Sequence, residues 1–289
     1  MYRRSIGLAV GAFLSFSGAA NAATAFSFST NGPDGLMGVL SRPESPGLDE
    51  HEIGDDFILP TETLLTSATF TGLMTNGGTP GQVRVEIYRV FPLDSTSPPS
   101  GNVPVRTNSP SDVEFADRDT ATNNLHFTTT TLAASFNVAN SVVNGIHPSP
   151  NQTTQGEGPV AGAEVEFSTT FDTPFDLPAG HYFFVPQVQT VGAGSEFLWL
   201  SAPKPIIPPG TPLAVDLQTW TRNTALDPDW LRVGTDIVGP INGVTPTFNA
   251  AFTLSGTAVP VPTSLKLGGP LLLLLSGCLV LRSRQRRTA

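Results

Sequence analysis

Short runs in which apolar and polar residues alternate recur along the chain. In the segment 82–90, Val83, Val85 and Ile87 fall on one side of an extended chain, and in 163–167 the odd positions are again apolar. Alternation with a period of two is typical of a strand with one buried face. Further strands are predicted over His181–Val185, Phe197–Leu200, Trp230–Val233 and Phe248–Leu254.

Turn-forming residues separate these runs, since the chain contains 28 glycines and 27 prolines. The segment most compatible with a helix is Leu132–Val143, but its β-branched and Asn residues disfavour one. Many short strands between Pro- and Gly-rich loops predict an all-β fold, a β-sandwich of the jelly-roll type. We expect one domain over 23–257. Two smaller sandwiches divided near 147–162 are the alternative.

The amino terminus has the pattern of a secretory signal peptide. A basic start at Arg3 and Arg4 precedes a short apolar run, and Ala20-Asn21-Ala22 follows with small residues at the positions that a signal peptidase reads. We expect residues 1–22 to be removed, with the cleavage directed by Ala20 and Ala22. The alternatives are cleavage in the segment 23–25 and retention of the apolar run as a membrane anchor.

The carboxyl terminus carries a second apolar segment, 267–281, followed by a basic tail, 282–289. Fifteen helical residues reach about 22 Å, which makes a short membrane span against a hydrocarbon core of about 30 Å. A buried core helix is the alternative. The basic cluster favours a cytoplasmic carboxyl terminus by the positive-inside rule. The arginines of this stop signal are Arg282, Arg284, Arg286 and Arg287.

A short motif and linker, 258–266, precede the apolar segment. The motif consists of Val259, Pro260, Val261, Pro262, Thr263 and Ser264. With the apolar helix and the basic tail, this order resembles the PEP-CTERM sorting signal over residues 259–289, although Val261 stands where the family has Glu. The resemblance implies export, retention in the inner membrane, processing by an exosortase-type transpeptidase, and a final location at the cell surface or in the extracellular matrix.

Charge and cysteine content narrow the classes of function. The whole chain has a formal net charge of −9, but seven of its basic residues lie in the two terminal segments. The segment between them has eight basic and 24 acidic residues, a net charge of −16. Such a body is a poor partner for nucleic acid, which requires basic surface. The one cysteine, Cys278, excludes an internal disulfide framework.

Several acidic residues are candidate calcium ligands, because calcium prefers carboxylate and carbonyl oxygens. The acidic run 49–56 contains Asp55 and Asp56, and a second pair, Asp227 and Asp229, flanks a proline. The spacing does not match an EF-hand loop. The simpler interpretations are a solvated acidic loop before the strand at Phe57 and an ordinary turn at Asp227.

Two further features have a catalytic or binding interpretation. Glu164 and Glu166 share one face of a predicted strand at a spacing of about 6–7 Å, which is compatible with a glycoside-active carboxyl pair. Ordinary alternation on a polar strand face explains the same pattern. Trp220 lies between two threonines and is a candidate platform for a sugar ring, whereas Trp199 lies in an apolar run that predicts core.

Together these patterns predict an exported, membrane-retained or surface-released protein of the bacterial envelope or extracellular matrix, without catalysis. The alternative is a carbohydrate-binding module for exopolysaccharide, and a glycoside-active enzyme is the third hypothesis. The expected partners are an exosortase-type enzyme and the membrane, and no cofactor is required, with calcium as an optional ligand.

Overall fold

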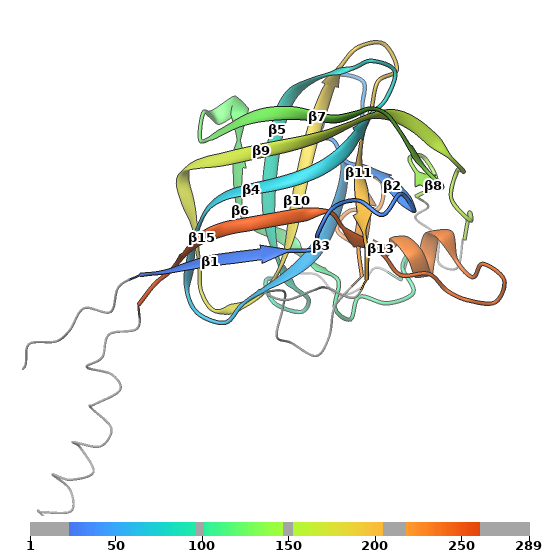
Figure 1. Ribbon diagram of the computed structural model, residues 1–289. Coiled ribbons are helices and arrows are strands. Elements are labelled where there is room, and N and C mark those ends of the chain that lie inside the picture. The colour runs from blue at the N-terminus through green and yellow to red at the C-terminus, as the bar shows by residue number, and fades with distance from the viewer. Residues whose placement is uncertain (1–22, 96–100, 147–152, 205–217, 261–289) are drawn as a thin grey trace, which may run out of the picture. The chain divides into compact units, whose positions relative to one another are not determined.

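Strands dominate the computed structural model, which describes residues 23–95, 101–146, 153–204 and 218–260 (Figure 1). Ala25–Val259 form one compact unit. The helical structure of the described residues is limited to a 3-10 turn, η1 (Thr120–Thr122), and a π-helical turn, η2 (Val233–Val238). The predicted all-β fold is therefore confirmed.

The larger sheet has nine strands and is organised around β4 (Thr63–Met74). Along one side β4 pairs with β15 (Phe252–Ala258) and β11 (Phe197–Ala202), and along the other it pairs with β9 (Val160–Leu177). The next strand, β7 (Leu125–Val138), pairs with β9. The remaining strands of this sheet are β1 (Thr24–Ser29), β2 (Met37–Leu40), β8 (Asn140–Val142) and β14 (Asn249–Ala250).

The smaller sheet has six strands and its pairings are antiparallel. Its order from edge to edge is β13 (Leu231–Arg232), β12 (Trp220–Asn223), β3 (His51–Leu59), β10 (Gly180–Val191), β5 (Thr79–Val90) and β6 (Pro110–Asp119).

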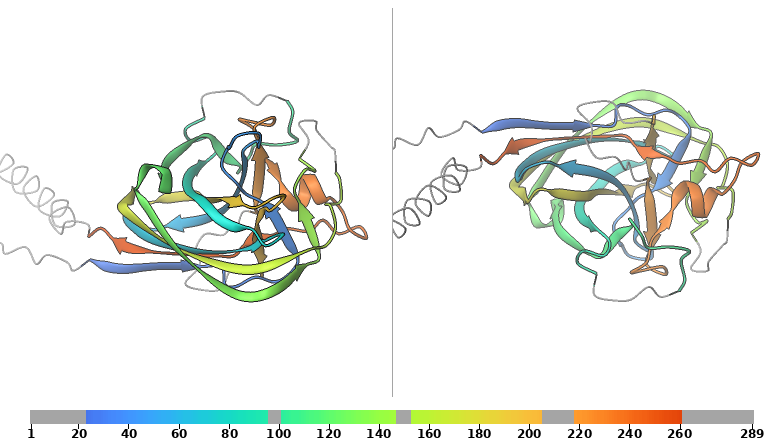
Figure 2. Two further views of the ribbon diagram at one scale, coloured as in Figure 1. Left: turned by 90° about the horizontal axis from the view of Figure 1, so that it is seen from above. Right: turned by 90° about the horizontal axis from the view of Figure 1, so that it is seen from below.

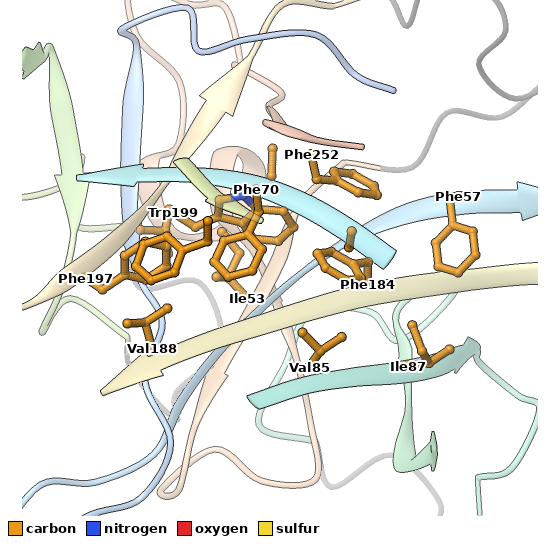
Figure 3. Packing of buried hydrophobic residues seen from close by; sticks show 14 of the residues in the cluster. Ile53, Phe57, Phe70, Val85, Ile87, Phe184, Val188, Phe197, Trp199 and Phe252 are labelled. Atoms are coloured by element: carbon orange, nitrogen blue, oxygen red, sulfur yellow. The ribbon is translucent and has the colours of Figure 1, made fainter. Parts of the chain in front are cut away.

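The two sheets face each other across a shared core that is rich in aromatic side chains (Figure 3). Phe184 of the smaller sheet stacks on Phe252 of the larger one, with ring centroids 5.2 Å apart and planes 9° apart. Phe70 and Phe167 stack in the same way at 5.1 Å within the larger sheet. The predicted core position of Trp199 is confirmed, since this side chain is fully buried. The architecture is that of a β-sandwich.

The alternation that predicted strands corresponds to the two faces of β5. Val83, Val85 and Ile87 are fully buried in the shared core, as expected. Glu86 and Tyr88 lie on the opposite face, which is exposed in a strand with one buried face, but here they are buried too, because further chain covers the outer face of the smaller sheet. The period was correctly interpreted, whereas the exposure of the second face was not.

Three local expectations are decided by the structure. The acidic run at 49–56 is not a solvated loop, because β3 begins at His51 and is buried along its whole length. The segment Leu132–Val143 contributes to β7 and β8, so the helical alternative is wrong. The strand predicted over Trp230–Val233 is only two residues long and continues into the π-helical turn η2.

Candidate functional site

The outer face of the six-stranded sheet carries a small second core, which consists of Tyr88, Phe183, Val185, Trp220 and Trp230. The indole of Trp230 meets the ring of Tyr88 edge-on, with centroids 5.3 Å apart. Since apolar side chains exclude water from this face, the charged groups beside them lie in a poorly screened environment. The candidate site is built from these charged groups.

Arg222 and Glu52 are the central ion pair of the site. They are direct register partners on β12 and β3, so the antiparallel ladder places the two side chains opposite each other. Arg222 donates to Glu52 through Nε and, at 3.1 Å, through Nη2. Its guanidinium also lies 4.4 Å from the ring centroid of Trp230. Burial disfavours the charged guanidinium, but Glu52 outweighs it and the pKa of Arg222 is raised.

Tyr88 connects this pair to a second carboxyl group, that of Glu86. The Tyr88 hydroxyl accepts from Arg222 Nη2 at 2.9 Å, and its oxygen lies 2.7 Å from Glu52 Oε1 and 3.1 Å from Glu86 Oε2. A hydroxyl has one proton and can donate to only one of two ionised carboxylates. Each of these contacts is a hydrogen bond when Tyr88 donates to Glu52 and a protonated Glu86 donates to Tyr88. Burial, then the charge of Glu52, raise the pKa of Glu86 well above its usual value.

Arg84 covers this carboxyl group from the solvent side. Its Nη2 lies 2.7 Å from Glu86 Oε1, whereas its distances to Glu50, Glu114 and Asp117 are 3.9, 3.7 and 3.8 Å. Burial lowers the pKa of Arg84, but the surrounding carboxylates outweigh that effect and raise it. Arg84 is therefore held by one close contact and three loose ones, and its side chain is 26% exposed.

These groups line an open cleft of about 270 Å³. Seven carboxyl groups line the cleft, together with two arginines and the polar side chains of Tyr88, Asn223 and Thr224. Within the cleft, burial and then Glu52 raise the pKa of Glu50, whose Oε1 accepts from Gln187 Nε2 at 2.9 Å. The seven carboxyl residues are Glu44, Glu50, Glu52, Glu86, Asp112, Glu114 and Asp227.

The geometry suits binding better than proton transfer. Both oxygens of Glu86 are engaged, one by Arg84 and one by Tyr88, and the residue is only 2% exposed. A general acid must come within hydrogen-bond reach of its substrate, and the carboxyl group of Glu86 is buried between Arg84 and Tyr88. The half-buried carboxylates, the arginine and the amide on the walls are donors and acceptors for a small polar ligand.

The four predicted calcium ligands are engaged with protein groups. Asp55 accepts from the Ala250 amide at 2.7 Å inside the core, and Asp56 lies 2.6 Å from His181 Nε2 on the other face of β3. Asp227 lies 2.8 Å from Arg222, and Asp229 lies 3.2 Å from Arg106. Across the described ranges, no group of three or more acidic, His or Cys side chains is arranged to hold a metal ion.

Trp220 is not a surface platform, which corrects the sequence-based expectation. Its side chain is 2% exposed, and the flanking Thr219 and Thr221 are buried as well. A polar–aromatic–polar sequence predicted exposure, but this strand is covered on both faces. Trp199 and Trp230 are also fully buried, so none of the three tryptophans offers a face to a sugar ring.

Glu164 and Glu166 lie on β9, away from the residues that line the cleft. They pair with Leu73 and Thr71 of β4. Both are half-buried, and burial raises the pKa of Glu164. The carboxyl pair that the structure does bring together is Glu52 and Glu86.

The sorting motif is described only at its start. Val259 donates its backbone N–H to Glu62 O at 2.8 Å, and Pro260 is exposed. Among the residues that are described, no helix combines the length and apolarity needed to cross a membrane. The other predicted processing and anchoring residues, Ala20, Ala22, Val261, Pro262, Thr263, Ser264, Arg282, Arg284, Arg286 and Arg287, lie outside the described residues.

Sequence reasoning missed the residues at the centre of the cleft. Glu52 and Arg222 are far from each other and from Glu86 and Tyr88 in the chain, and only the pairing of β3, β10, β5 and β12 brings these three segments together. One signal was available, since Arg84, Glu86 and Tyr88 alternate on one face of a strand. That alternation predicted a polar face, not a buried one.

Comparisons of the chain with protein-family models, with curated proteins and with solved structures find no match. The chemistry of the site is therefore inferred from its own residues.

Proposed function

We propose that the chain is an exported, non-catalytic protein of the bacterial envelope or extracellular matrix, retained through a carboxyl-terminal segment that resembles a PEP-CTERM signal. In this proposal residues 1–22 are a signal peptide, 267–281 span the inner membrane, and an exosortase-type enzyme processes the precursor. The β-sandwich, assigned more finely to the jelly-roll type, is the part exposed outside the cell.

The placement of the chain ends carries this proposal. β1 and β15 are neighbours in the larger sheet, and the start of β1 lies at the same end of the pair as the end of β15 (Figure 1). The opposite ends are joined by contacts between Ser29 Oγ and Thr253 Oγ1 at 2.9 Å and between Thr30 N and Phe252 O at 3.0 Å. The compact unit therefore begins and ends at one pole, where a signal peptide can be removed and a tail attached without breaking a strand.

The cleft opens far from that pole. Leu59, at the end of β3, is followed by a short turn into Thr63, which pairs with Ala258. Glu52 is seven residues before Leu59 in the same strand, a distance of about 23 Å along the chain. A body tethered at Val259 thus presents its cleft away from the attachment point, as a surface-exposed binding or scaffold protein requires.

Truncation tests the retention part of the proposal. A chain that ends after Pro260 keeps β15 and the Val259–Glu62 hydrogen bond, so the body should fold and appear in the medium, whereas the full chain should remain with the membrane fraction. Equal retention of the two chains would overturn the proposal. Val261→Glu, which restores the family residue, should leave retention intact and increase processing of the tail.

A second candidate, carbohydrate binding, is favoured by the cleft and not by Trp220. Sugar hydroxyl groups both donate and accept, and the walls of the cleft offer carboxylates, Arg84 and Asn223 at its rim. Calorimetric titration with a panel of exopolysaccharides tests this candidate. Binding that is weakened by Asn223→Ala and Glu114→Gln would support it, and no heat above dilution for any member of the panel would exclude it.

A further inference from the structure

A small cavity of about 10 Å³ lies in the core between the two sheets and shares no lining residue with the open cleft. Strands β2 and β11 of the larger sheet and β3 of the smaller sheet contribute to its walls. Most of the lining is apolar and buried, through Met37, Val39, Ile53, Trp199 and Phe248. The few polar groups that line the cavity therefore determine what it can hold.

Asn249, on β14, is the first of these polar groups. Its side chain is fully buried, and within the described part of the chain neither Oδ1 nor Nδ2 has a hydrogen-bond partner. A side-chain amide carries an acceptor oxygen and two N–H donors. Buried polar groups of this kind nearly always bond to protein or to ordered water, so the Asn249 amide requires a partner inside the cavity.

Thr219 supplies a second hydroxyl group in the same position. The residue is 2% exposed, and its Oγ1 has no hydrogen-bond partner among the described residues. Its backbone is fully paired, since the N–H donates to Phe248 O at 3.0 Å and the C=O accepts from the Val233 N–H at 3.0 Å. The side-chain hydroxyl is thus the one polar group of Thr219 that is left to bind a ligand.

Ser201 also lines the cavity, but its hydroxyl is already engaged. The Ser201 hydroxyl donates to Asp34 Oδ1 and accepts from the Met37 N–H at 2.9 Å. The side chains that can bind an occupant are therefore Asn249 and Thr219, which do not bond to each other.

We propose that this cavity binds one water molecule, which bridges the side-chain amide of Asn249 and the hydroxyl of Thr219. The volume selects the occupant, because about 10 Å³ is close to the smallest space that holds a single water molecule. The chemistry agrees, since a buried water needs two or more polar partners. A metal ion fits poorly, because no cluster of three or more acidic, His or Cys side chains in the described ranges is arranged to hold one.

The bridging water links the two sheets. Asn249 belongs to the larger sheet, and Thr219 directly precedes β12 of the smaller sheet, three residues before Arg222. Val233, which bonds to Thr219, opens η2, and η2 lies at the end of the body remote from the start of β1 in both views of Figure 2. The water site is therefore separate from the chain ends, and the inference does not depend on the proposed export or retention.

A crystal structure of the full wild-type chain in detergent, at a resolution that shows ordered water, tests the proposal without any variant. Electron density for one water should lie within about 3.2 Å of Thr219 Oγ1 and of one amide atom of Asn249. A cavity without density would overturn the proposal. So would a larger molecule in the cavity, or a direct hydrogen bond between Asn249 and Thr219.

Magnetic relaxation dispersion of the solvent gives a second test in solution, because it counts the water molecules that stay inside the protein. Asn249→Leu combined with Thr219→Val replaces both polar groups by apolar ones of similar shape, and this variant should hold one long-lived water fewer than the wild type. Thr221→Val is the matched control, since Thr221 is fully buried but its hydroxyl donates to Glu52 O at 2.7 Å. The control should keep the wild-type number. An equal number in the double variant and the wild type would contradict the proposal.

Discussion

Arg222 and Glu52 face each other as direct register partners on neighbouring strands, and the guanidinium contacts both oxygens of the carboxylate. Both residues are buried on the outer face of the smaller sheet. The outer face of a sheet is often exposed to water, but here it is covered and contains a buried ion pair. The stability and the pH response of the body should therefore depend on charged groups more than is usual for a β-sandwich.

Arg222→Ala should destabilise the body by about 3–5 kcal/mol, because removal of one partner leaves a buried carboxylate without its counterion. Urea unfolding followed by Trp fluorescence measures the change. Arg89→Ala is the control, since Arg89 pairs with Asp94 at a more exposed position and such pairs contribute about 1 kcal/mol or less. An Arg222 variant that is no less stable than the Arg89 variant would contradict the assigned role of the pair.

Glu86→Gln should stabilise the body at pH 8 and leave it unchanged near pH 4. Burial and Glu52 raise the pKa of Glu86 in the folded state above its ordinary value of 4.5. The native state therefore binds the extra proton, and the stability it gives is full below pH 4.5 and lost as the pH rises through the folded pKa. Glutamine cannot ionise and avoids this loss.

The free energy of unfolding of Glu86→Gln and of the wild type, measured at several pH values, checks this prediction. Glu114→Gln, in the same cleft at a more exposed position, serves as the control. A Glu86 variant with the same pH dependence as the wild type would show that no proton is held between Glu52 and Glu86.

His51 should have the opposite effect to Glu86 on the pH dependence of stability, because it should destabilise the folded state at acidic pH. Burial, then the charge of Arg42, lower the pKa of His51 from 6.5 to about 4. The unfolded chain binds the proton first, so stability is full above pH 6.5 and falls as the pH drops towards 4, by about 3 kcal/mol at 1.36 kcal/mol per pH unit.

His51→Gln should reduce that acid-induced loss, although the substitution itself costs some stability at pH 7. Thermal unfolding between pH 7 and pH 4 measures the slope. His126→Gln is the matched control, because the side chain of His126 is 67% exposed. If the two variants show the same slope as the wild type, His51 is not the group that titrates.

Gly72→Ala should destabilise the core by about 1–3 kcal/mol, as overpacking does. A methyl group at Gly72 would lie 1.9 Å from Phe197 Cε2, and Phe197 is fixed between Phe70 and Phe167. A Cβ at Gly32 would have no atom within 4 Å, so Gly32→Ala should be close to neutral. Denaturant midpoints compare the two, and an equal midpoint for both variants would contradict the tight packing assigned to Gly72.

The sequence predicted the part of the fold that depends on local pattern. The alternation of Val83, Val85 and Ile87 identified a strand and its core face, because the period of a strand is a property of neighbouring residues. The apolar run containing Trp199 identified core for the same reason. In both cases the neighbouring residues in the sequence are enough to predict the burial.

The prediction failed where burial depends on distant chain. Trp220 and Glu86 lie in sequences that look half exposed, but the second core around Trp230 covers them. Asp55 and Asp56 were interpreted as a solvated loop, yet their partners, the Ala250 amide and His181, are more than a hundred residues away. No local pattern can indicate that an acidic segment will find such partners.

Fractionation combined with intact-mass measurement tests the proposed role most directly. The full chain has a mass of 30.4 kDa, and cells that produce it should yield a species lacking residues 1–22 in the membrane or surface fraction. Processing of the tail would remove further mass from the carboxyl terminus of the released form. Recovery of the intact 289-residue chain from the cytoplasm would contradict both the export and the sorting of this protein.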